Sequence, residues 1–484
     1  MLPRNDLRWT RRETLAALAC LPASGATARS QDGTKFIFAD QARSLATTSP
    51  GALTLLIPLG SRKNIEPIAR DFKQLTGVAI HIREAEVREI GTTLLVNKLQ
   101  GKKRFDIALP ATYEIPDLVA ADALIPLDDL EGFQSAQAHY PSALYTNGDS
   151  FDGKAYGHQT DGDVYLMICN EGILSNPEVA ERYADQHGAA LVPPKSWQEF
   201  DRQIRFVHER LEQPGAIMFR GNGGVEWEFW LRLHAKGIWP LNANFDPQID
   251  SEQGIEVLED MIETDEFVVD ASGDRNFGAV WQDFQSSGAY ATFGWGGTQK
   301  IFREASKGRA DRYRFAPIPG GEEPGTPEAL SYFNWGWSYT VVSGTDVPEL
   351  ALSFVNFAIT PEMSSLAVRE SGGFFDPFRP EHYEDPDIRD IYGPAFLAVH
   401  KNALMNAIPD FYIADRGAYF ESLGAWLELA LQRGIKPETA LKNAADHWRL
   451  LGDEAERGNQ AKRWQQLRSK YPHQVSSRLR DLPV

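Results

Sequence analysis

Residues 53–110 read LTLLIPLGSRKNIEPIARDFKQLTGVAIHIREAEVREIGTTLLVNKLQGKKRFDIALP, and their apolar residues recur at two alternating spacings. Short runs of consecutive apolar residues, typical of buried strands, alternate with segments whose apolar residues recur every three to four positions, as in amphipathic helices. Gly77 and Gly101 follow the two helical segments, where glycine commonly ends a helix. The stretch predicts strands over 53–59, 78–82 and 105–110, with helices over 65–75 and 90–99 between them.

This strand–helix order predicts an α/β fold with a parallel sheet and right-handed crossovers. In such sheets, ligands bind outside the carboxyl ends of the strands. Those ends lead here into the loops Gly60–Arg62, Glu84–Glu86 and Ala111–Glu114. Arg62, Tyr113 and Glu114 are therefore candidate ligand-binding residues.

The same pattern resumes after about residue 170. Ser196 and Glu199 form a capping-box signature for a helix that begins at about residue 197. Strands are predicted over 215–219 and 289–293, a helix over 350–358, and mostly amphipathic helix from there to about residue 471. Because no charged linker divides the chain once, two α/β lobes are favoured over one very large sheet.

The first 28 residues have the features of an export signal. Arg11 and Arg12 precede a short apolar stretch, and Ala26–Ala28 supplies an A-x-A-like cleavage site. The paired arginines indicate the twin-arginine (Tat) route. An alternative is a lipoprotein cleaved before Cys20. After cleavage at residue 28 only Cys169 would remain, which excludes an intramolecular disulfide and fits folding in a reducing compartment before export.

Composition excludes several classes of protein. The formal net charge is −18, which disfavours a nucleic-acid partner, because such binders cluster positive charge. Two cysteines exclude a disulfide scaffold and a Cys-rich metal site. No later segment has the roughly 18 uncharged apolar residues of a transmembrane helix. The chain is rich in aromatic residues, with 26 Phe, 15 Tyr and 12 Trp.

Motifs for catalysis and for cofactors are missing from the sequence. It contains no H-E-x-x-H, G-x-S-x-G, P-loop or C-x-x-C motif, so we expect neither a metal nor a cofactor. Asp161 and Asp163 are paired carboxylates, and a glycosidase needs two such groups across a sugar.

Aromatic residues recur instead where loops follow the predicted strands, and polar residues lie beside them. Sugars suit such surfaces, because their C–H faces stack on flat rings and their hydroxyls donate to carboxylates. The aromatic candidates, with Tyr113, are Trp227, Trp230, Trp295, Trp335 and Trp337. The polar candidates, with Arg62 and Glu114, are Asp161, Asp163, Glu226 and Asp376.

The order of several short segments resembles the extracellular solute-binding proteins of ABC importers, in the sugar-binding group that includes maltose-binding protein. The resemblance covers about residues 50–470. It rests on Phe105–Ala108, Leu124–Leu130, Tyr156–Asn170, Pro194–Phe200, Gly288–Gly297 and Ala316–Gly320. Departures from the family pattern include Cys169 before Asn170, and the segment 374–392, which leaves Asp376 and Arg379 open as pocket residues.

The resemblance implies a periplasmic-binding-protein-like fold with two lobes, a hinge of several segments and a ligand cleft between the lobes. Three crossovers are expected near residues 160–166, 334–340 and 370–385. The implied organisation is a signal peptide over 1–28, a strap over 29–52, lobe 1 over 53–162 plus about 338–375, lobe 2 over 163–337 plus about 385–471, and a tail over 472–484.

The resemblance also implies a function, which is binding without turnover. We expect a periplasmic, monomeric receptor that captures a neutral sugar, oligosaccharide or sugar alcohol and docks on an ABC permease. Two alternatives stay open. The same fold could bind a polyamine or another small polar solute, or the chain could be an exported enzyme acting on polysaccharide, with Asp161 and Asp163 as acid and base.

Overall fold

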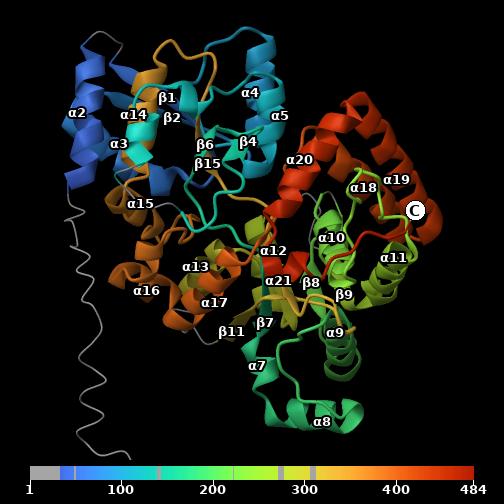
Figure 1. Cartoon of the computed structure of the whole chain (residues 1–484). Helices are drawn as coiled ribbons and strands as arrows, with labels where there is room; N and C mark the ends of the chain where they lie inside the picture. Colours follow the sequence, from blue (N-terminus) through green and yellow to red (C-terminus); the bar gives the residue numbers. More distant parts are fainter. Residues whose placement is uncertain are drawn as a thin grey trace, which may run out of the picture.

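A computed structural model describes residues 33–47, 51–137, 139, 143–221, 223–270, 277–305 and 312–483. The predicted signal peptide lies outside the described residues. The chain forms two α/β lobes, each built around its own five-stranded sheet (Figure 1). This confirms the predicted fold class.

The lobe 1 sheet has the strand order β2-β1-β3-β15-β6. Strand β1 pairs in parallel with β2 and with β3, as the alternating pattern of residues 53–110 predicted. The sheet is mixed, however, because β15 runs antiparallel to both β3 and β6. Its strands are β1 (Ala52–Pro58), β2 (Ala79–Ala85), β3 (Ile107–Ala108), β6 (Gly157–Gln159) and β15 (Ser338–Val341).

Helices cover this sheet, and Gly77 ends the first predicted one in the left-handed conformation (φ 80°). The lobe 1 helices are α2 (Thr34–Ala46), α3 (Arg62–Thr76), α4 (Ile90–Leu99), η2 (Thr112–Glu114), α5 (Ile115–Ala120), η3 (Leu127–Asp129), α6 (Phe133–Gln137), α14 (Pro348–Ala358) and α15 (Pro361–Val368), and a hairpin joins β4 (Ser150–Phe151) to β5 (Lys154–Ala155).

The expected strap over residues 29–52 contains a regular helix, α2. Phe38, Ala39 and Ala42 are fully buried along one of its faces, and the helix packs against α14 and α3 (Figure 1). The polar and small residues around these three positions masked the short apolar face in the sequence.

The lobe 2 sheet has the order β11-β7-β10-β8-β9. Strand β10 runs parallel to β8 and antiparallel to β7. The sheet strands are β7 (Leu166–Asn170), β8 (Ala216–Met218), β9 (Val268–Asp270), β10 (Ala291–Gly294) and β11 (Tyr313–Ala316). Two short pairs lie outside it: β12 (Ile318–Pro319) with β13 (Ala329–Leu330), and β14 (Tyr332–Phe333) with β16 (Ile408–Pro409).

Lobe 2 carries most of the helices. The predicted cap is present, since Ser196 Oγ accepts the backbone N–H of Glu199 at 3.2 Å. The helices are α7 (Glu171–Leu174), α8 (Pro177–His187), α9 (Trp197–Leu211), α10 (Val225–Ala235), α11 (Glu252–Thr264), η4 (Asp265–Phe267), α12 (Phe277–Ser287), α13 (Gly296–Ala305), η6 (Pro380–Tyr383), α16 (Pro386–Tyr392), α17 (Pro394–Met405), α18 (Arg416–Leu431), α19 (Pro437–Glu454), α20 (Arg457–Ser469) and α21 (His473–Ser476).

Three chain segments cross between the lobes. Crossover 1 joins β6 to β7, crossover 2 joins β14 to β15, and crossover 3 runs from α15 to η6. Crossovers 1 and 3 touch, because a Cβ added at Gly162 would lie 2.1 Å from the carbonyl oxygen of Pro377. The hinge therefore consists of packed segments and not of free linkers.

The C-terminal tail was predicted over residues 472–484, and its described part, residues 472–483, packs on lobe 2. Val475 and Leu479 are buried, and Arg480 forms a bridge with Ile238. Basic and polar residues separate the few apolar positions of this segment.

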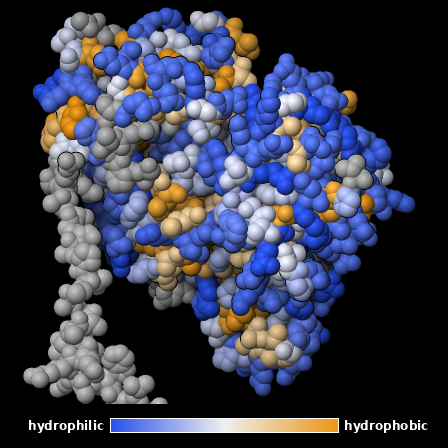
Figure 2. Space-filling view, in the orientation of Figure 1, coloured by the Kyte–Doolittle hydropathy of each residue, from blue (hydrophilic) through white to orange (hydrophobic). Residues whose placement is uncertain are grey.

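Figure 2 shows hydrophilic residues over most of one face, with apolar residues in small separate patches. Among the described residues, no single helix has the length and hydropathy of a membrane span. Helices α14 and α15, which bend by 67° at the break between them, meet these criteria only when they are taken together.

Candidate functional site

Five aromatic side chains from both lobes and from crossovers 1 and 2 gather at one place, which we call the aromatic site. Its members are Tyr113, Tyr165, Trp227, Trp295 and Trp335. The Trp335 ring lies at its centre, 5.1 Å from Tyr113, 5.9 Å from Trp227 and 6.1 Å from Trp295. The Trp337 ring lies 6.0 Å from Trp335 and continues the group toward Phe374.

The indole N–H groups of the aromatic site differ in their partners. Trp295 donates its Nε1–H to Asn334 Oδ1 at 2.9 Å. The Nε1 atom of Trp227 is buried, and no acceptor lies within hydrogen-bonding distance of it among the described residues. A buried donor without a partner costs free energy, so this N–H is suited to an acceptor that a ligand supplies.

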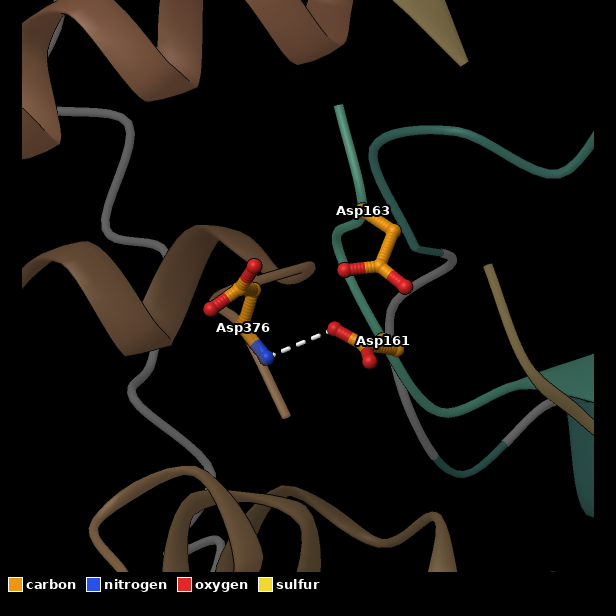
Figure 3. Close-up of side chains that lie close together, drawn as sticks. All are labelled: Asp161, Asp163 and Asp376. Atoms are coloured by element: carbon orange, nitrogen blue, oxygen red, sulfur yellow. Dashed lines mark hydrogen bonds between the residues drawn. The ribbon is translucent and has the colours of Figure 1, made fainter. Parts of the chain in front are cut away.

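Three carboxylates meet where crossover 1 touches crossover 3, and we call them the acid cluster. Asp161, Asp163 and Asp376 each place an oxygen within 4.8 Å of the others (Figure 3). The backbone N–H of Asp376 donates to Asp161 Oδ1 at 2.6 Å. Asp376 in turn accepts the N–H of Gly297 at 2.9 Å and the hydroxyl of Tyr392 at 2.8 Å.

Burial dominates the electrostatics of the acid cluster. It raises the pKa of Asp376 to about 6 against the opposing charge of Lys300, and it raises the pKa values of Asp161 and Asp163 well above their usual range. Burial also lowers the pKa of Lys300 to about 8, although the acid cluster favours its charge. Three buried carboxylates face a single lysine, so burial and like-charge repulsion both favour their protonated forms.

The acid cluster is close enough to chelate a cation, yet a cationic side chain already lies beside it. Lys300 Nζ donates to the carbonyl oxygens of Phe375 at 2.8 Å and Glu370 at 3.1 Å. The carboxylates also lie against one another. Asp161 and Asp163 both contact Asp376, whereas a glycosidase holds its two carboxylates across a sugar.

Two glutamates lie near the aromatic site and bind backbone N–H groups. Glu114 accepts from Ala111 at 3.0 Å and from Gly91 at 3.2 Å, and burial raises its pKa to about 7. Glu226 accepts from Gly224 at 2.8 Å, and burial raises its pKa as well. Both carboxylates retain oxygen lone pairs that can accept ligand hydroxyls.

Two of the predicted site residues lie elsewhere. Arg62 forms a half-exposed ion pair with Glu84 of β2, with Nε and Oε2 2.8 Å apart. Trp230 is completely buried in the core of lobe 2, where its ring packs against Phe411 and Phe420. Asp376 reaches the acid cluster, whereas the open candidate Arg379 lies over the ring of Phe378.

Sequence reasoning missed Arg88 and Arg416. Arg88 precedes α4 in lobe 1, and its Nη2 donates to the carbonyl oxygen of Gly223 in lobe 2 at 2.7 Å. Arg416 opens α18, and its guanidinium lies 4.4 Å from the Tyr113 ring centre. Arg88 lies in the loop after β2, a strand end from which only Glu84–Glu86 had been named, whereas Arg416 follows no predicted strand and lies in no quoted motif.

The fold and this interlobe site define a two-lobed binding protein. A model of the bacterial extracellular solute-binding protein family matches residues 68–391. The chain belongs to that family, which confirms the resemblance seen in the sequence.

A curated relative, the probable amino-acid ABC transporter periplasmic-binding protein y4oP of Sinorhizobium fredii, is 27% identical over 263 residues. The alignment covers 52% of this chain and 57% of the relative, so the chain spans just over half of that protein's length.

Solved structures share the fold at low sequence identity. The maltose-bound MalE3 of T. maritima has a TM-score of 0.70 at 16% identity, covering 83% of this chain and 99% of that one. Solute-binding proteins of Agrobacterium radiobacter with ribitol and Agrobacterium vitis with D-mannitol have TM-scores of 0.68 and 0.65, both at 15% identity. They cover 83% and 84% of this chain, and 98% and 99% of their own chains.

Proposed function

We propose that this protein is the exported, substrate-binding component of an ABC importer and that it captures a neutral sugar, oligosaccharide or sugar alcohol between its lobes. The aromatic site carries the proposal. Tyr113 comes from lobe 1, Trp227 from lobe 2 and Trp335 from crossover 2, so a ligand stacked on these rings would contact both lobes and the hinge at once.

The polar groups around the rings suit hydroxyls, which both donate and accept hydrogen bonds. Carboxylates of Glu114 and Glu226 can accept, while the buried Nε1–H of Trp227 requires an acceptor. Three similar solved structures hold maltose, ribitol and D-mannitol, which supports a carbohydrate class without identifying the compound.

A cationic solute is the second candidate, and the acid cluster favours it. Buried carboxylates beside aromatic rings attract ammonium groups. The curated relative is named for amino-acid transport, which also points to a charged solute. A polyamine such as putrescine, however, has no acceptor atom for the Trp227 N–H when its amines are protonated.

Tryptophan fluorescence and calorimetry would test both candidates. We expect saturable binding of at least one compound in a panel of maltose, ribitol and D-mannitol, with no displacement by putrescine. Displacement by putrescine or by an amino acid would establish the second candidate. Saturable binding of none of the sugars and polyols would overturn the carbohydrate assignment.

Binding without turnover belongs to the same proposal, because the matched family is named for solute binding. The bound compound should be recovered chemically unchanged after long incubation. We further propose that the mature protein is a periplasmic monomer and that its ligand-bound form docks on membrane permease subunits.

A further inference from the structure

Arg416 is a buried arginine, 6% exposed, at the first position of α18 in lobe 2. Its Nη2 donates to Asp410 Oδ2 at 2.7 Å, and the other oxygen of Asp410 accepts the hydroxyl of Tyr332 at 2.5 Å. This anchoring fixes the guanidinium from one side. Charge-assisted bonds of this kind are strong and directional.

The flat faces of the same guanidinium contact aromatic rings. Its central carbon lies 4.0 Å from the centre of Phe420, on α18 itself, and 4.4 Å from the centre of Tyr113. Phe420 moves with Arg416, but Tyr113 belongs to lobe 1. Separation of the lobes would therefore remove the Tyr113 contact and leave the contacts to Asp410 and Phe420 in place.

A second nitrogen of the Arg416 guanidinium is the Nε atom. Its Nε is buried, and no acceptor lies within hydrogen-bonding distance among the described residues. The charge of Arg416 also acts on Glu226, whose carboxylate pKa it lowers against the effect of burial. Arg416 thus contacts the ring of Tyr113, and that ring lies 5.1 Å from Trp335 in the aromatic site.

Resting on the proposed function, we propose that Arg416 is a positioning residue that couples ligand binding to closure of the lobes. The Nε–H donates to an oxygen of the bound sugar or polyol, and the guanidinium face binds Tyr113 across the lobe boundary. A ligand that contacts Arg416 then stabilises the arrangement of lobes in which Tyr113 contacts it too. Nothing in the local sequence around residue 416 indicated this role.

The test compares Arg416→Met, Arg416→Lys and Tyr113→Leu with the unaltered protein. Methionine keeps much of the side-chain length but removes the charge and the donors, whereas lysine keeps the charge without the planar face. Tyr113→Leu removes the cross-lobe partner and leaves the Arg416–Asp410 pair intact, so it remains informative if Arg416→Met folds poorly.

Arg468→Met is the matched control. The Arg468 guanidinium lies 4.2 Å from the Trp239 ring, and both residues belong to lobe 2. The Arg468→Met substitution therefore removes a comparable stacking contact that lies away from the boundary between the lobes.

The readouts are the dissociation constants for maltose, ribitol and D-mannitol and the distance between the lobes. Pulsed electron paramagnetic resonance would measure that distance between spin labels at Leu99→Cys and Leu450→Cys, which are exposed positions on α4 and α19. Cys20→Ser removes a competing thiol, and Cys169 is buried.

We expect Arg416→Met and Tyr113→Leu each to weaken binding about 10-fold, and to lengthen the interlobe distance in the presence of ligand. Arg416→Lys should recover part of the affinity, the double variant should lose little more than either single variant, and Arg468→Met should match the unaltered protein.

Unchanged affinity and distance in both single variants would overturn the inference, as would equal effects of Arg468→Met. If the unaltered protein binds none of the three probes, the proposed function fails and the inference falls with it, and that result is distinct from binding that is insensitive to residue 416.

Discussion

The backbone N–H of Asp376 donates a 2.6 Å hydrogen bond to Oδ1 of Asp161, and this bond joins crossover 3 to crossover 1 inside the hinge. The carboxyl of Asp376 also lies against Asp163, which belongs to crossover 1 as well. The acid cluster therefore lies at the point where the two crossovers meet.

The first prediction concerns pH. Because the pKa of Asp376 is about 6 in the folded protein and near 3.8 when unfolded, the proton binds more tightly to the folded state. The stabilising contribution of that proton is complete below about pH 4 and is lost as the pH rises through 6. Asp376→Asn is neutral throughout, so relative to wild type it should gain about 2–3 kcal/mol between pH 4 and pH 7.

Urea unfolding at several pH values would measure this difference. Asp346→Asn is the control, because its side chain is 73% exposed and its ion pair with Lys103 lies at the surface. We expect it to change the unfolding free energy by less than about 1 kcal/mol. Parallel pH profiles for wild type and Asp376→Asn would contradict the prediction.

The second prediction concerns the close approach of the crossovers at Gly162. A Cβ at this position would meet the carbonyl oxygen of Pro377 at 2.1 Å and the His400 ring at 3.1 Å. The His400 Nε2 also hydrogen-bonds the Gly162 carbonyl oxygen at 3.0 Å, so the backbone there has little room to shift. Gly162→Ala should destabilise the protein by about 1–3 kcal/mol.

Gly458→Ala is the matched control for that substitution. Gly458 lies in α20, and a Cβ there would meet no heavy atom within 4 Å. Because alanine favours a helix over glycine, we expect a gain of up to about 1 kcal/mol. Thermal or urea unfolding of both variants would decide the matter, and a Gly162→Ala protein as stable as wild type would show that the crossovers separate freely.

Much of the fold was predictable because its elements are encoded locally. The strands and helices of residues 53–110 follow the spacing of their own apolar residues, and Gly77 and Ser196 mark helix ends through their own backbone or side chain. Helix α2 was missed because only Phe38, Ala39 and Ala42 define its buried face. The pairing of β15 with β3 depends on residues more than 200 positions apart, which no local pattern records.

The site was predictable in part, for the same reason. Loops after strands pointed to Tyr113, Trp295 and the paired aspartates, all of which lie at the hinge or the aromatic site. Trp227 and Trp230 looked equivalent because every residue of α10 is buried, so helical periodicity could not separate the face toward the aromatic site from the face toward the core. Arg416 lies near the aromatic site only because of tertiary packing, which no local sequence pattern records.

The third prediction concerns export. If Arg11 and Arg12 direct the chain to the Tat route, Arg11→Lys combined with Arg12→Lys should leave most of the protein in the cytoplasm. Cell fractionation and the intact mass of the periplasmic protein would test this, with cleavage expected after residue 28. The Cys20→Ser variant tests the lipoprotein alternative, and its export and mature mass should match those of the unaltered protein apart from the substitution if cleavage follows residue 28. An unaltered mature protein that begins at a lipid-modified Cys20 would contradict cleavage after residue 28.

The fourth prediction compares two tryptophans, Trp335 in crossover 2 and Trp230 in the core of lobe 2. Trp335 contacts rings from both lobes at the aromatic site, so Trp335→Leu should weaken binding of a sugar or polyol about 10-fold or more. Trp230 lies in the core of lobe 2, so Trp230→Leu should cost about 2–4 kcal/mol of unfolding free energy and leave the dissociation constant nearly unchanged. Calorimetric titration and urea unfolding of both variants supply the comparison. A large loss of affinity in Trp230→Leu, at a temperature where it remains folded, would place Trp230 in the binding site as the sequence first suggested.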